Sequence, residues 1–309
     1  MTLPATRWVI RNPDLPRSAD DVLAALLANR GLDRASLACR PEELEAASRS
    51  IRNLDAAAGR TARAVQEGER IVLVGDYDCD GLTSVAQLAG FLRALGFRDF
   101  AALTPASRAD GYGMPLDAAR KHPDARLFIV FDSGTFDVAA VEAARARGAD
   151  VIVIDHHEIS DAASLAPATH LVNPRHPDCP SPFKDFATAG LTLLFLDRLG
   201  RALPERGMRA GPDEDALALA AVGTLADMMP LRGANRAIVA LGLEALNRGR
   251  QPALQALRAV AGLAGRRLTP GHIGFQIAPR LNAAARVAEA RIALDLLLAE
   301  EPNEIDRLP

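Results

Sequence analysis

Short apolar runs alternate with amphipathic segments through the middle of the chain, between residues 71 and 173. The apolar runs lie at 71–75, 101–104, 127–131, 151–154 and 169–172, and helical patterns at 82–96, 115–121 and 137–148 separate the first four. Such alternation indicates βαβ crossovers, because each amphipathic helix covers the sheet while the chain returns to begin the next parallel strand. The pattern predicts the α/β class, with a mostly parallel sheet flanked by helices.

The two ends of the chain have a different pattern. Amphipathic segments at 20–29 and 41–60 precede the first strand, and beyond Ala187 the pattern is almost wholly helical, including helices over 213–226 and 286–301. We therefore expect three parts. They are an N-terminal cap segment over 1–50, an α/β domain that carries the chemistry over 51–232, and a basic helical extension over 233–309 that leads to a C-terminal domain absent from this chain.

Composition places the chain among globular proteins. Of its 309 residues, 49% are hydrophobic and 24% are charged, which is enough apolar surface for one large domain or two smaller ones. No apolar run approaches the roughly 18 residues of a transmembrane helix, and the N-terminus lacks the pattern of a secretory signal. Three widely spaced cysteines can form neither a disulfide framework nor a zinc site. We expect a cytoplasmic protein without membrane association.

Charge is unevenly distributed along the chain. The net charge is −3, yet the stretch from Arg232 to Arg291 contains ten arginines and only two acidic residues. A basic lobe beside an acidic cleft suits a polyanionic substrate. Arginine-rich helix faces exposed to solvent would give the same pattern, so charge alone leaves both interpretations open.

Three carboxylates follow the first apolar run, in the segment GDYDCDG at 75–81. Asp76, Asp78 and Asp80 are spaced two residues apart, which places side chains on one face of an extended backbone. Asp78 and Asp80 can therefore reach adjacent cations. A capped turn between strand and helix, or a calcium-type loop, is the structural alternative, but the further ligands of an EF-hand are missing. We interpret the segment as a metal-binding turn.

Two further clusters follow the third and fourth apolar runs. Asp132, in FDSG, could be a helix N-cap, but beside Asp78 and Asp80 it is the natural carboxylate to bridge two cations. Asp155, His156 and His157 stand in IDHHE. Consecutive side chains point in different directions, so one imidazole can bind an ion while the other faces the substrate as a hydrogen-bond donor or general acid. Asp155 would then fix the imidazole tautomer.

The remaining candidates lie in the helical part of the chain. Asp227, in GTLADMMPL, ends the helix predicted over 213–226, where the helix dipole disfavours a carboxylate unless a cation is bound. Arg280 and Arg286, in PRLNAAARV, have a loop-to-helix setting that suits phosphate binding, although structural ion pairs would explain them equally well. Carboxylates and imidazoles gathered at the carboxyl edge of a parallel sheet predict a divalent-metal hydrolase that uses Mn²⁺ or Mg²⁺.

In this order and spacing, the motifs resemble the DHH phosphoesterase superfamily, whose name comes from the motif present here at 155–157. Within it they look like the RecJ-type single-stranded-DNA-specific exonucleases. The matching segments, over roughly residues 50–300, are GDYDCDGLTS, DGYGM, FDSG, VIDHHE, NP at 173–174, GTLADMMPL and IAPRLNAAARV. The resemblance implies two-metal hydrolysis of single-stranded DNA from the 5′ end, with release of 5′-mononucleotides, in recombination and DNA repair. Single-strand-binding and recombination proteins are then candidate partners, and a monomer is expected.

The resemblance also implies a role for each ligand. Asp78 would bind the first ion and Asp80 the second, with Asp132 as the bridge between them. His156 and Asp227 would complete the coordination of the second ion. The predicted α/β domain would be the DHH catalytic domain.

The other implied roles concern the substrate. His157 would lie against the scissile phosphate, with Asp76 as a supporting carboxylate. Arg280 falls on the family's substrate-binding arginine motif, and Arg108 lies one position away from another of its arginines. Val74 stands where some members carry a histidine ligand for the first ion. The family's glycine-rich C-terminal substrate-binding domain is absent, as is any OB-fold that would hold single strands.

Two alternatives remain open. A small-substrate member of the superfamily would cleave short oligonucleotides, phosphoadenosine phosphate, cyclic dinucleotides or pyrophosphate, and a degenerate member would serve as a non-catalytic replication scaffold. The arginines between 232 and 291 favour a longer strand over the first alternative. The second requires lost ligands, and here only the optional histidine is replaced.

Overall fold

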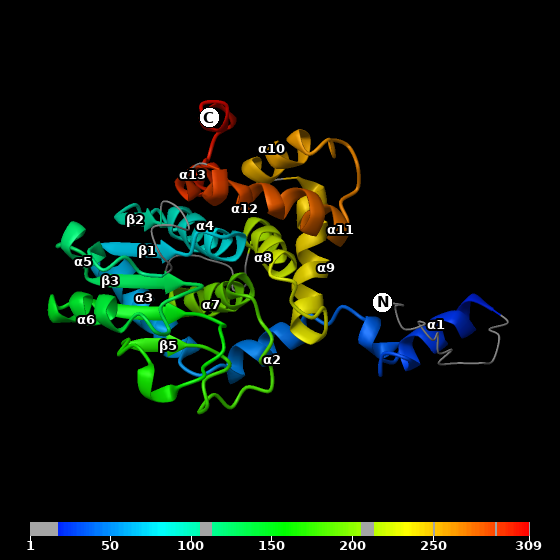
Figure 1. The fold of residues 1–309 in the computed structure, drawn as a ribbon, viewed down its shortest axis with the longest axis horizontal. Helices are drawn as coiled ribbons and strands as arrows, with labels where there is room; N and C mark the ends of the chain where they lie inside the picture. The colour runs from blue at the N-terminus through cyan, green and yellow to red at the C-terminus, as the bar shows by residue number, and fades with distance from the viewer. Residues whose placement is uncertain (1–17, 106–112, 205–212, 250, 288, 309) are drawn as a thin grey trace, which may run out of the picture.

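A five-stranded sheet, parallel throughout, lies at the centre of the protein, in the order β2-β1-β3-β4-β5. The computed structural model describes residues 18–105, 113–204, 213–249, 251–287 and 289–308 (Figure 1). The strands are β1 (Ile71–Gly75), β2 (Phe100–Leu103), β3 (Leu127–Phe131), β4 (Asp150–Ile154) and β5 (His170–Val172). The predicted α/β class is confirmed, and all five strands lie within one residue of their predicted bounds.

The strand order reverses between β1 and β3, which are neighbours in the sheet although β2 lies between them in sequence. Their register pairs Ile71 with Leu127 and Gly75 with Phe131, so the two strands end level. In open parallel sheets, ligands bind beyond the carboxyl ends of the strands at such a reversal. The acidic segment after β1 and Asp132 after β3 therefore meet at the edge where a ligand is expected.

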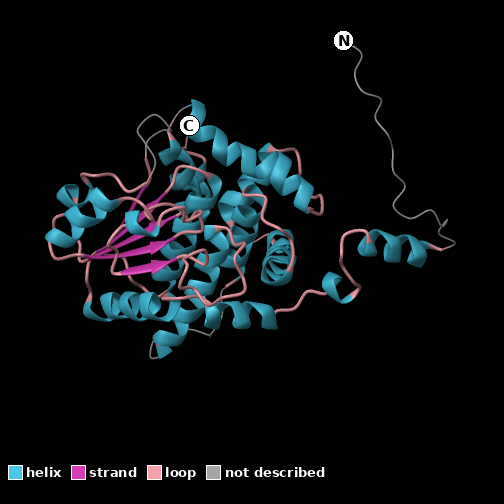
Figure 2. Ribbon diagram, turned by 60° about the horizontal axis from the view of Figure 1, so that its bottom comes forward, coloured by secondary structure: helices cyan, strands magenta, loops and turns pink. Residues whose placement is uncertain are grey.

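Apolar residues cover both faces of the sheet, because successive side chains of a strand point to opposite sides. Ile71 and Leu73 join a large core on one face, and Val72 and Val74 join a smaller one on the other. Figure 2 shows the strands lying side by side among helices. The helices of the larger core include α3 (Leu54–Glu67), α4 (Cys79–Ala94) and α7 (Thr188–Ala202), and those of the smaller are α5 (Ala118–Lys121) and α6 (Val138–Ala146).

The C-terminal part of the described chain is helical, as predicted, and packs on the α/β part. Helix α8 (Glu214–Ala226) contacts α4 and α9 (Gly233–Arg248), and α13 (Ala290–Leu298) contacts α4, so their apolar residues join the larger core. The single helix predicted over 286–301 is wrong, because Glu289 adopts an extended conformation that separates two helices. The elements are α8 (Glu214–Ala226), α9 (Gly233–Arg248), α10 (Pro252–Val260), α11 (Pro270–His272), a π-helical turn (Ile273–Ile277), α12 (Ala278–Val287), α13 (Ala290–Leu298) and α14 (Pro302–Ile305).

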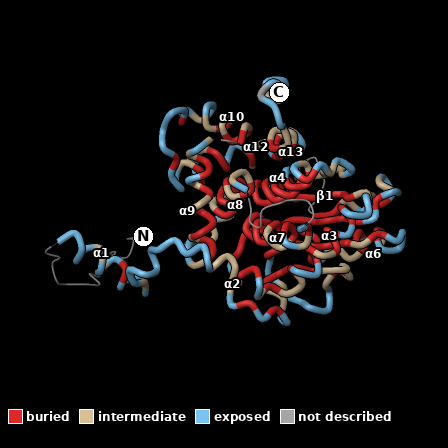
Figure 3. The backbone as a smooth tube through the Cα atoms, turned by 180° about the vertical axis from the view of Figure 1, so that it is seen from behind, coloured by how far each residue is buried: buried red, intermediate tan, exposed pale blue. Residues whose placement is uncertain are grey.

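The N-terminal elements differ in how closely they approach the rest of the molecule. Helix α2 (Glu42–Ser50) packs against α7 and α9. Helix α1 (Ala19–Ala28) lies apart from the sheet in Figures 1 and 3, and most of its residues are exposed. A short 3₁₀ turn, Ala35–Leu37, lies between them. The domain boundaries at 50 and 232 stay predictions. None of the helices in the described ranges is long and apolar enough to cross a membrane.

Candidate metal centre

The turn after β1 carries three carboxylates, and within it the backbone at the start of α4 packs closely against the backbone at the end of β1. Asp78 is the N-cap of α4, and its Oδ1 accepts hydrogen bonds from the N–H groups of Asp80 at 2.9 Å and Gly81 at 3.2 Å. A Cβ at Gly81 would lie 2.5 Å from the backbone nitrogen of Asp76, so only glycine fits there. Asp76 and Asp80 are almost fully buried. The chain thus brings charged groups out of water at the start of a helix, where the dipole favours negative charge.

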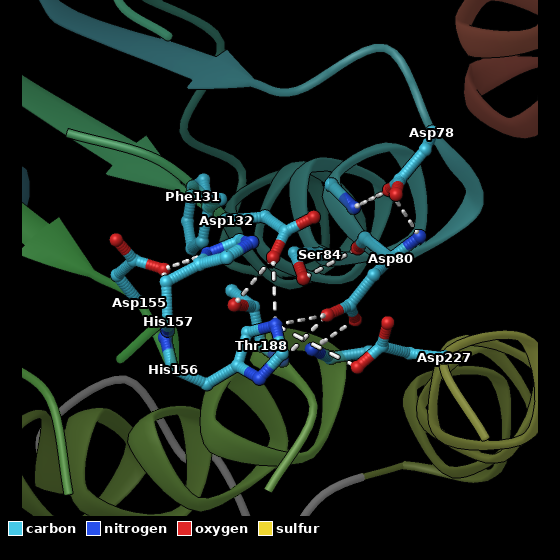
Figure 4. A network of polar contacts seen from close by, with 12 residues as sticks. Asp78, Asp80, Ser84, Phe131, Asp132, Asp155, His156, His157, Thr188 and Asp227 are labelled. Atoms are coloured by element: carbon cyan, nitrogen blue, oxygen red, sulfur yellow. Dashed lines mark hydrogen bonds and ion pairs between the residues drawn. The ribbon is translucent and has the colours of Figure 1, made fainter. Parts of the chain in front are cut away.

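Asp132 adopts a backbone conformation that side chains rarely take. Its φ is 61°, in the left-handed region, immediately after β3. Its N–H donates to the carbonyl of Ile154 at 3.0 Å, which ties the end of β3 to the end of β4. Left-handed non-glycine residues store strain of about 1–3 kcal/mol and concentrate at functional sites. The conformation directs a buried carboxylate between the acidic turn and the histidine pair (Figure 4).

The two adjacent imidazoles lie close together after β4, with ring centroids 4.6 Å apart, but they make different polar contacts. The Nε2 atom of His156 lies 3.3 Å from Asp132 Oδ1, 3.6 Å from Asp227 Oδ2 and 3.7 Å from Asp80 Oδ2. The Nδ1 atom of His157 instead lies 2.7 Å from Asp155 Oδ1, and its side chain is 46% exposed. Figure 4 shows three carboxylates converging on His156 from different elements. One imidazole therefore lies among carboxylates and the other toward solvent.

The N-terminus of α7 holds two of these carboxylates. The N–H groups of Thr188 and Ala189 donate to the two oxygens of Asp80, each at 2.7 Å. The hydroxyl of Thr188 donates to Asp132 Oδ1 at 3.1 Å. Helix N-termini stabilise anions through unpaired N–H groups and the helix dipole. Helix α7 thus positions the carboxylates of the β1 and β3 turns relative to each other.

Helix α8 delivers Asp227 from the opposite side. Asp227 is the C-cap of α8, and its Oδ2 is buried without a hydrogen-bond partner among the described residues. A Cβ at Gly223, one turn earlier, would lie 2.4 Å from Ala189 Cβ and 3.0 Å from Asp80 Oδ1. The absence of a side chain at Gly223 lets α8 approach α7 and α4 closely enough for Asp227 to reach His156.

Burial dominates the electrostatics of the carboxylates. Burial, and then the charge of Asp78, raises the pKa of Asp76 to about 7, that of Asp80 to about 8 and that of Asp227 to about 6. Burial and the charge of Asp80 raise the pKa of Asp132 well above its ordinary range. A divalent cation would relieve the repulsion between these carboxylates, because its positive charge favours the charged form of each of them.

The histidines are shifted in opposite directions. Burial, and then the neighbouring His157, lowers the pKa of His156 to about 4, so its imidazole is neutral at pH 7 as a metal ligand must be. The hydrogen bond to Asp155 raises the pKa of His157. Burial raises the pKa of Asp155, but the hydrogen bonds from His157 and Thr135 outweigh it and hold that pKa below its usual value. The Asp155–His157 pair thus favours a charged imidazole.

The donor atoms form sets that fit two cations. Among the described residues there are three groups of possible ligands whose donor atoms all lie within 4.8 Å of one another, and Asp132 belongs to two of them. Within the part of the chain that the structure describes, Asp76 Oδ1 also has no hydrogen-bond partner although it is buried. Oxygen-rich donors with one imidazole suit Mn²⁺ or Mg²⁺. The three groups are Asp76, Asp78 and Asp132; Asp80, His156 and Asp227; and Asp132, His156 and His157.

Comparison with known families matches this architecture. The N-terminal domain model of the DHH family covers residues 70–224, from β1 to the last turns of α8. The chain belongs to the DHH family. The predicted superfamily is therefore confirmed.

Curated relatives extend the similarity beyond that domain. This DHH protein is 33% identical to the single-stranded-DNA-specific exonuclease RecJ of Bacillus subtilis, over 98% of this chain and 39% of the relative. It is 33% identical to RecJ of Escherichia coli over 98% of this chain and 55% of the relative. It is 36% identical to RecJ of Thermus thermophilus over 84% of this chain and 37% of the relative. The chain therefore spans about half, or less, of the length of these relatives.

Solved structures agree in fold. The match to a crystal structure of exonuclease RecJ bound to manganese covers 84% of the DHH protein and 64% of the RecJ chain, with a TM-score of 0.74 and 35% identity. The match to RecJ from Thermus thermophilus in complex with Mn²⁺ covers 92% of the DHH protein and 40% of the RecJ chain, with a TM-score of 0.74 and 33% identity. The metal ions named in these structures are the ions expected from the donor atoms of the DHH protein.

The predicted substrate-binding arginines are placed only in part. Arg280 and Arg286 both lie inside α12, so their predicted loop-to-helix setting is wrong. The π-helical turn carries the chain from α11 directly into α12, and the Arg280 guanidinium donates to the Gln276 carbonyl. Arg108 lies outside the described residues. Val74 is fully buried in the smaller core and carries no ligand atom to the site.

Three residues at the centre escaped sequence reasoning. Thr188 and Gly223 have no charge and no distinctive local pattern, although Gly223 lies in the quoted GTLADMMPL segment. Asn282, in PRLNAAARV, accepts a hydrogen bond from the N–H of Cys79 at 2.7 Å. Each of these residues contacts a part of the chain that is distant in sequence or lies on another helix. Rules based on the local spacing of residues do not predict such contacts.

Proposed function

We propose that the DHH protein hydrolyses phosphodiester bonds in single-stranded DNA from the 5′ end and releases 5′-mononucleotides. The observation that carries the proposal is the convergence of Asp80, Asp132 and Asp227 on the Nε2 atom of His156, with a second carboxylate group that shares Asp132. RecJ relatives at 33–36% identity act on single-stranded DNA by their names. Similarity and donor geometry therefore support the same reaction.

The residues would divide between two ions, Mn²⁺ or Mg²⁺. Asp78, with the neighbouring Asp76, would hold the first ion, and Asp132 would be shared between the two. Asp80, His156 and Asp227 would complete the second. When bound, such ions neutralise phosphate charge and activate water.

The histidine beside the ions has a separate task. Because Asp155 accepts at Nδ1 of His157, the imidazole is oriented and its charged form is favoured. A half-exposed, charged His157 would lie against the scissile phosphate, where it would stabilise the charge that develops or donate a proton to the leaving oxygen. Asn173 donates to the His157 carbonyl at 3.0 Å and so holds the backbone of this residue in place.

The basic extension would bind the strand outside the metal centre. We propose Arg280, Arg286 and Arg108 as phosphate-binding residues. The first two are exposed on α12, which packs against α4 and α8, the helices that carry Asp78 and Asp227. Contacts of this kind supply affinity that falls with salt.

The wider setting of the reaction is part of the same proposal. We infer a cytoplasmic monomer that works in recombination and DNA repair beside single-strand-binding and recombination proteins. The domain division at residues 50 and 232 belongs to it as well, with further parts supplied in the longer relatives, of which this chain spans 37–55%.

Digestion of end-labelled oligonucleotides with Mn²⁺ tests the proposal. Single strands labelled at the 5′ or the 3′ end would be compared with a duplex and a dinucleotide, using Asp132→Ala as the inactive control. Immediate release of labelled mononucleotide from the 5′ end, with the duplex spared, is expected. Cleavage of the dinucleotide alone would favour a small-substrate phosphoesterase, and no cleavage of any substrate would favour a non-catalytic scaffold.

A further inference from the structure

A nearly bare aromatic side chain lies on the helical segment that borders the metal centre. Phe275, in the π-helical turn, is 86% exposed, whereas its neighbours Ile273 and Ile277 are fully buried. π-helical turns are rare and frequently lie at functional sites. The turn therefore presents one large apolar side chain to solvent while its other face stays in the core.

Contacts at both ends place this segment along the rim of the site. At one end, a Cβ on Gly274 would lie 4.0 Å from the carbonyl oxygen of Leu225, two residues before Asp227. At the other, Asn282 Oδ1 accepts from the N–H of Cys79, the residue after Asp78. The segment from α11 to α12 thus extends from the Asp227 side of the centre to the Asp78 side.

The exposed face of this segment combines apolar and cationic groups. Phe275, Pro279 and Arg286 are exposed at helical spacing, with Arg280 beside them. Neither Arg280 nor Arg286 forms an ion pair with any residue in the described ranges. Met228, the residue after Asp227, is 87% exposed and has a φ of 53°. Apolar surface and positive charge therefore lie together beside an acidic centre.

Single-stranded nucleic acid matches this combination, since arginines bind its phosphates and aromatic rings stack on its bases. We propose that Phe275 is a base-stacking residue that holds a nucleotide of the bound strand next to the metal centre. The inference rests on the proposed function and adds a contact to the base, whereas Arg280 and Arg286 would contact phosphate alone. Stacking would be tolerant of sequence, because every base has a π-face.

Binding of two matched strands separates stacking from phosphate contact. Fluorescence anisotropy would compare a 12-mer of thymidylate with an abasic 12-mer of equal phosphate number, with Ca²⁺ in place of Mn²⁺ to slow cleavage. The variants are Phe275→Ala and Phe275→Trp. Val260→Ala is the matched control, since Val260 is an apolar side chain that is 76% exposed on another helix, at the end of α10.

Phe275→Ala should weaken binding of the thymidylate strand by about 5- to 150-fold, the range of one stacked base, and leave the abasic strand unaffected. Phe275→Trp should retain binding, and Val260→Ala should bind both strands as the parent does. Unchanged thymidylate binding in Phe275→Ala would overturn the inference and point to a protein surface over Phe275. An equal loss on both strands would overturn it too, as would a parent protein that binds neither strand.

The Mn²⁺ digestion distinguishes this inference from the proposed function. If the parent protein binds with base-dependent affinity but cleaves no strand, the exonuclease proposal fails and the stacking role of Phe275 stands. If cleavage proceeds and Phe275→Ala binds thymidylate normally, only the stacking role fails.

Discussion

Replacing Thr188 by valine removes one hydroxyl from the metal centre and little else. Thr188 is fully buried at the first position of α7, and its hydroxyl donates to Asp132 Oδ1 at 3.1 Å. Valine has nearly the same shape, and the backbone N–H that donates to Asp80 at 2.7 Å is retained. The variant therefore tests whether α7 orients the carboxylate proposed to bridge two ions.

The expected loss follows from the charge of the acceptor. A hydrogen bond to a charged group contributes about 1.5–3 kcal/mol, and partners that orient metal ligands typically change metal affinity by about 10–100-fold when removed. A 10–100-fold change corresponds to about 1.4–2.7 kcal/mol, so the two ranges agree. Without metal, burial and the charge of Asp80 raise the pKa of Asp132, which disfavours its charged form. The free energy of unfolding of the metal-free protein should accordingly fall by only about 1 kcal/mol.

Titration with Mn²⁺, followed by the electron paramagnetic resonance of the free ion, measures the affinity directly. Thr188→Val should bind Mn²⁺ about 10–100-fold more weakly, and Thr188→Ser, which keeps the hydroxyl, should stay close to the parent. Urea denaturation of the metal-free proteins is the control for folding. Parent-like Mn²⁺ affinity in Thr188→Val would refute the reasoning. A loss shared equally by Thr188→Ser would assign the effect to methyl packing instead.

Three further changes test other parts of the structure. Gly223→Ala places a Cβ 2.4 Å from Ala189 Cβ, so urea denaturation should show about 1–3 kcal/mol of destabilisation and titration a weaker Mn²⁺ affinity; parent-like values would refute the tight packing. Asp150→Asn removes a 2.5 Å ion pair with Arg60 and should cost about 0.5–1 kcal/mol at neutral pH. Burial raises the pKa of Asp150, but its hydrogen bonds, led by the one from Arg60, outweigh burial and hold the pKa below its ordinary value of 3.8. The stabilisation by the ion pair is therefore present above pH 3.8 and is lost as the pH falls below it. The stabilities of the parent and Asp150→Asn, plotted against pH, should accordingly converge in acid. Arg280→Ala should raise KM more than it lowers kcat, with a shallower salt dependence, and an unchanged KM would remove Arg280 from the substrate site.

Local patterns were enough to predict the sheet and the chemistry at its edge. Strand runs such as 127–131 are short, apolar and bounded by polar residues, and the parallel order follows from the helices between them. Because parallel strands end at one edge, the acidic segment after β1 and the histidine pair after β4 had to lie on the same side of the sheet. The motifs by themselves therefore predicted a metal centre.

Packing of distant helices decided the rest. Asp80 meets the N-terminus of α7 from 108 positions away, and Cys79 meets Asn282 from 203 away. Which imidazole lies among Asp80, Asp132 and Asp227, and which one pairs with Asp155, depends on side-chain directions that residue spacing alone does not set. Likewise, a π-helical turn leading into α12 replaced the loop expected before Arg280. Periodicity reports which face of an element is buried, whereas contacts between elements depend on how those faces pack in three dimensions.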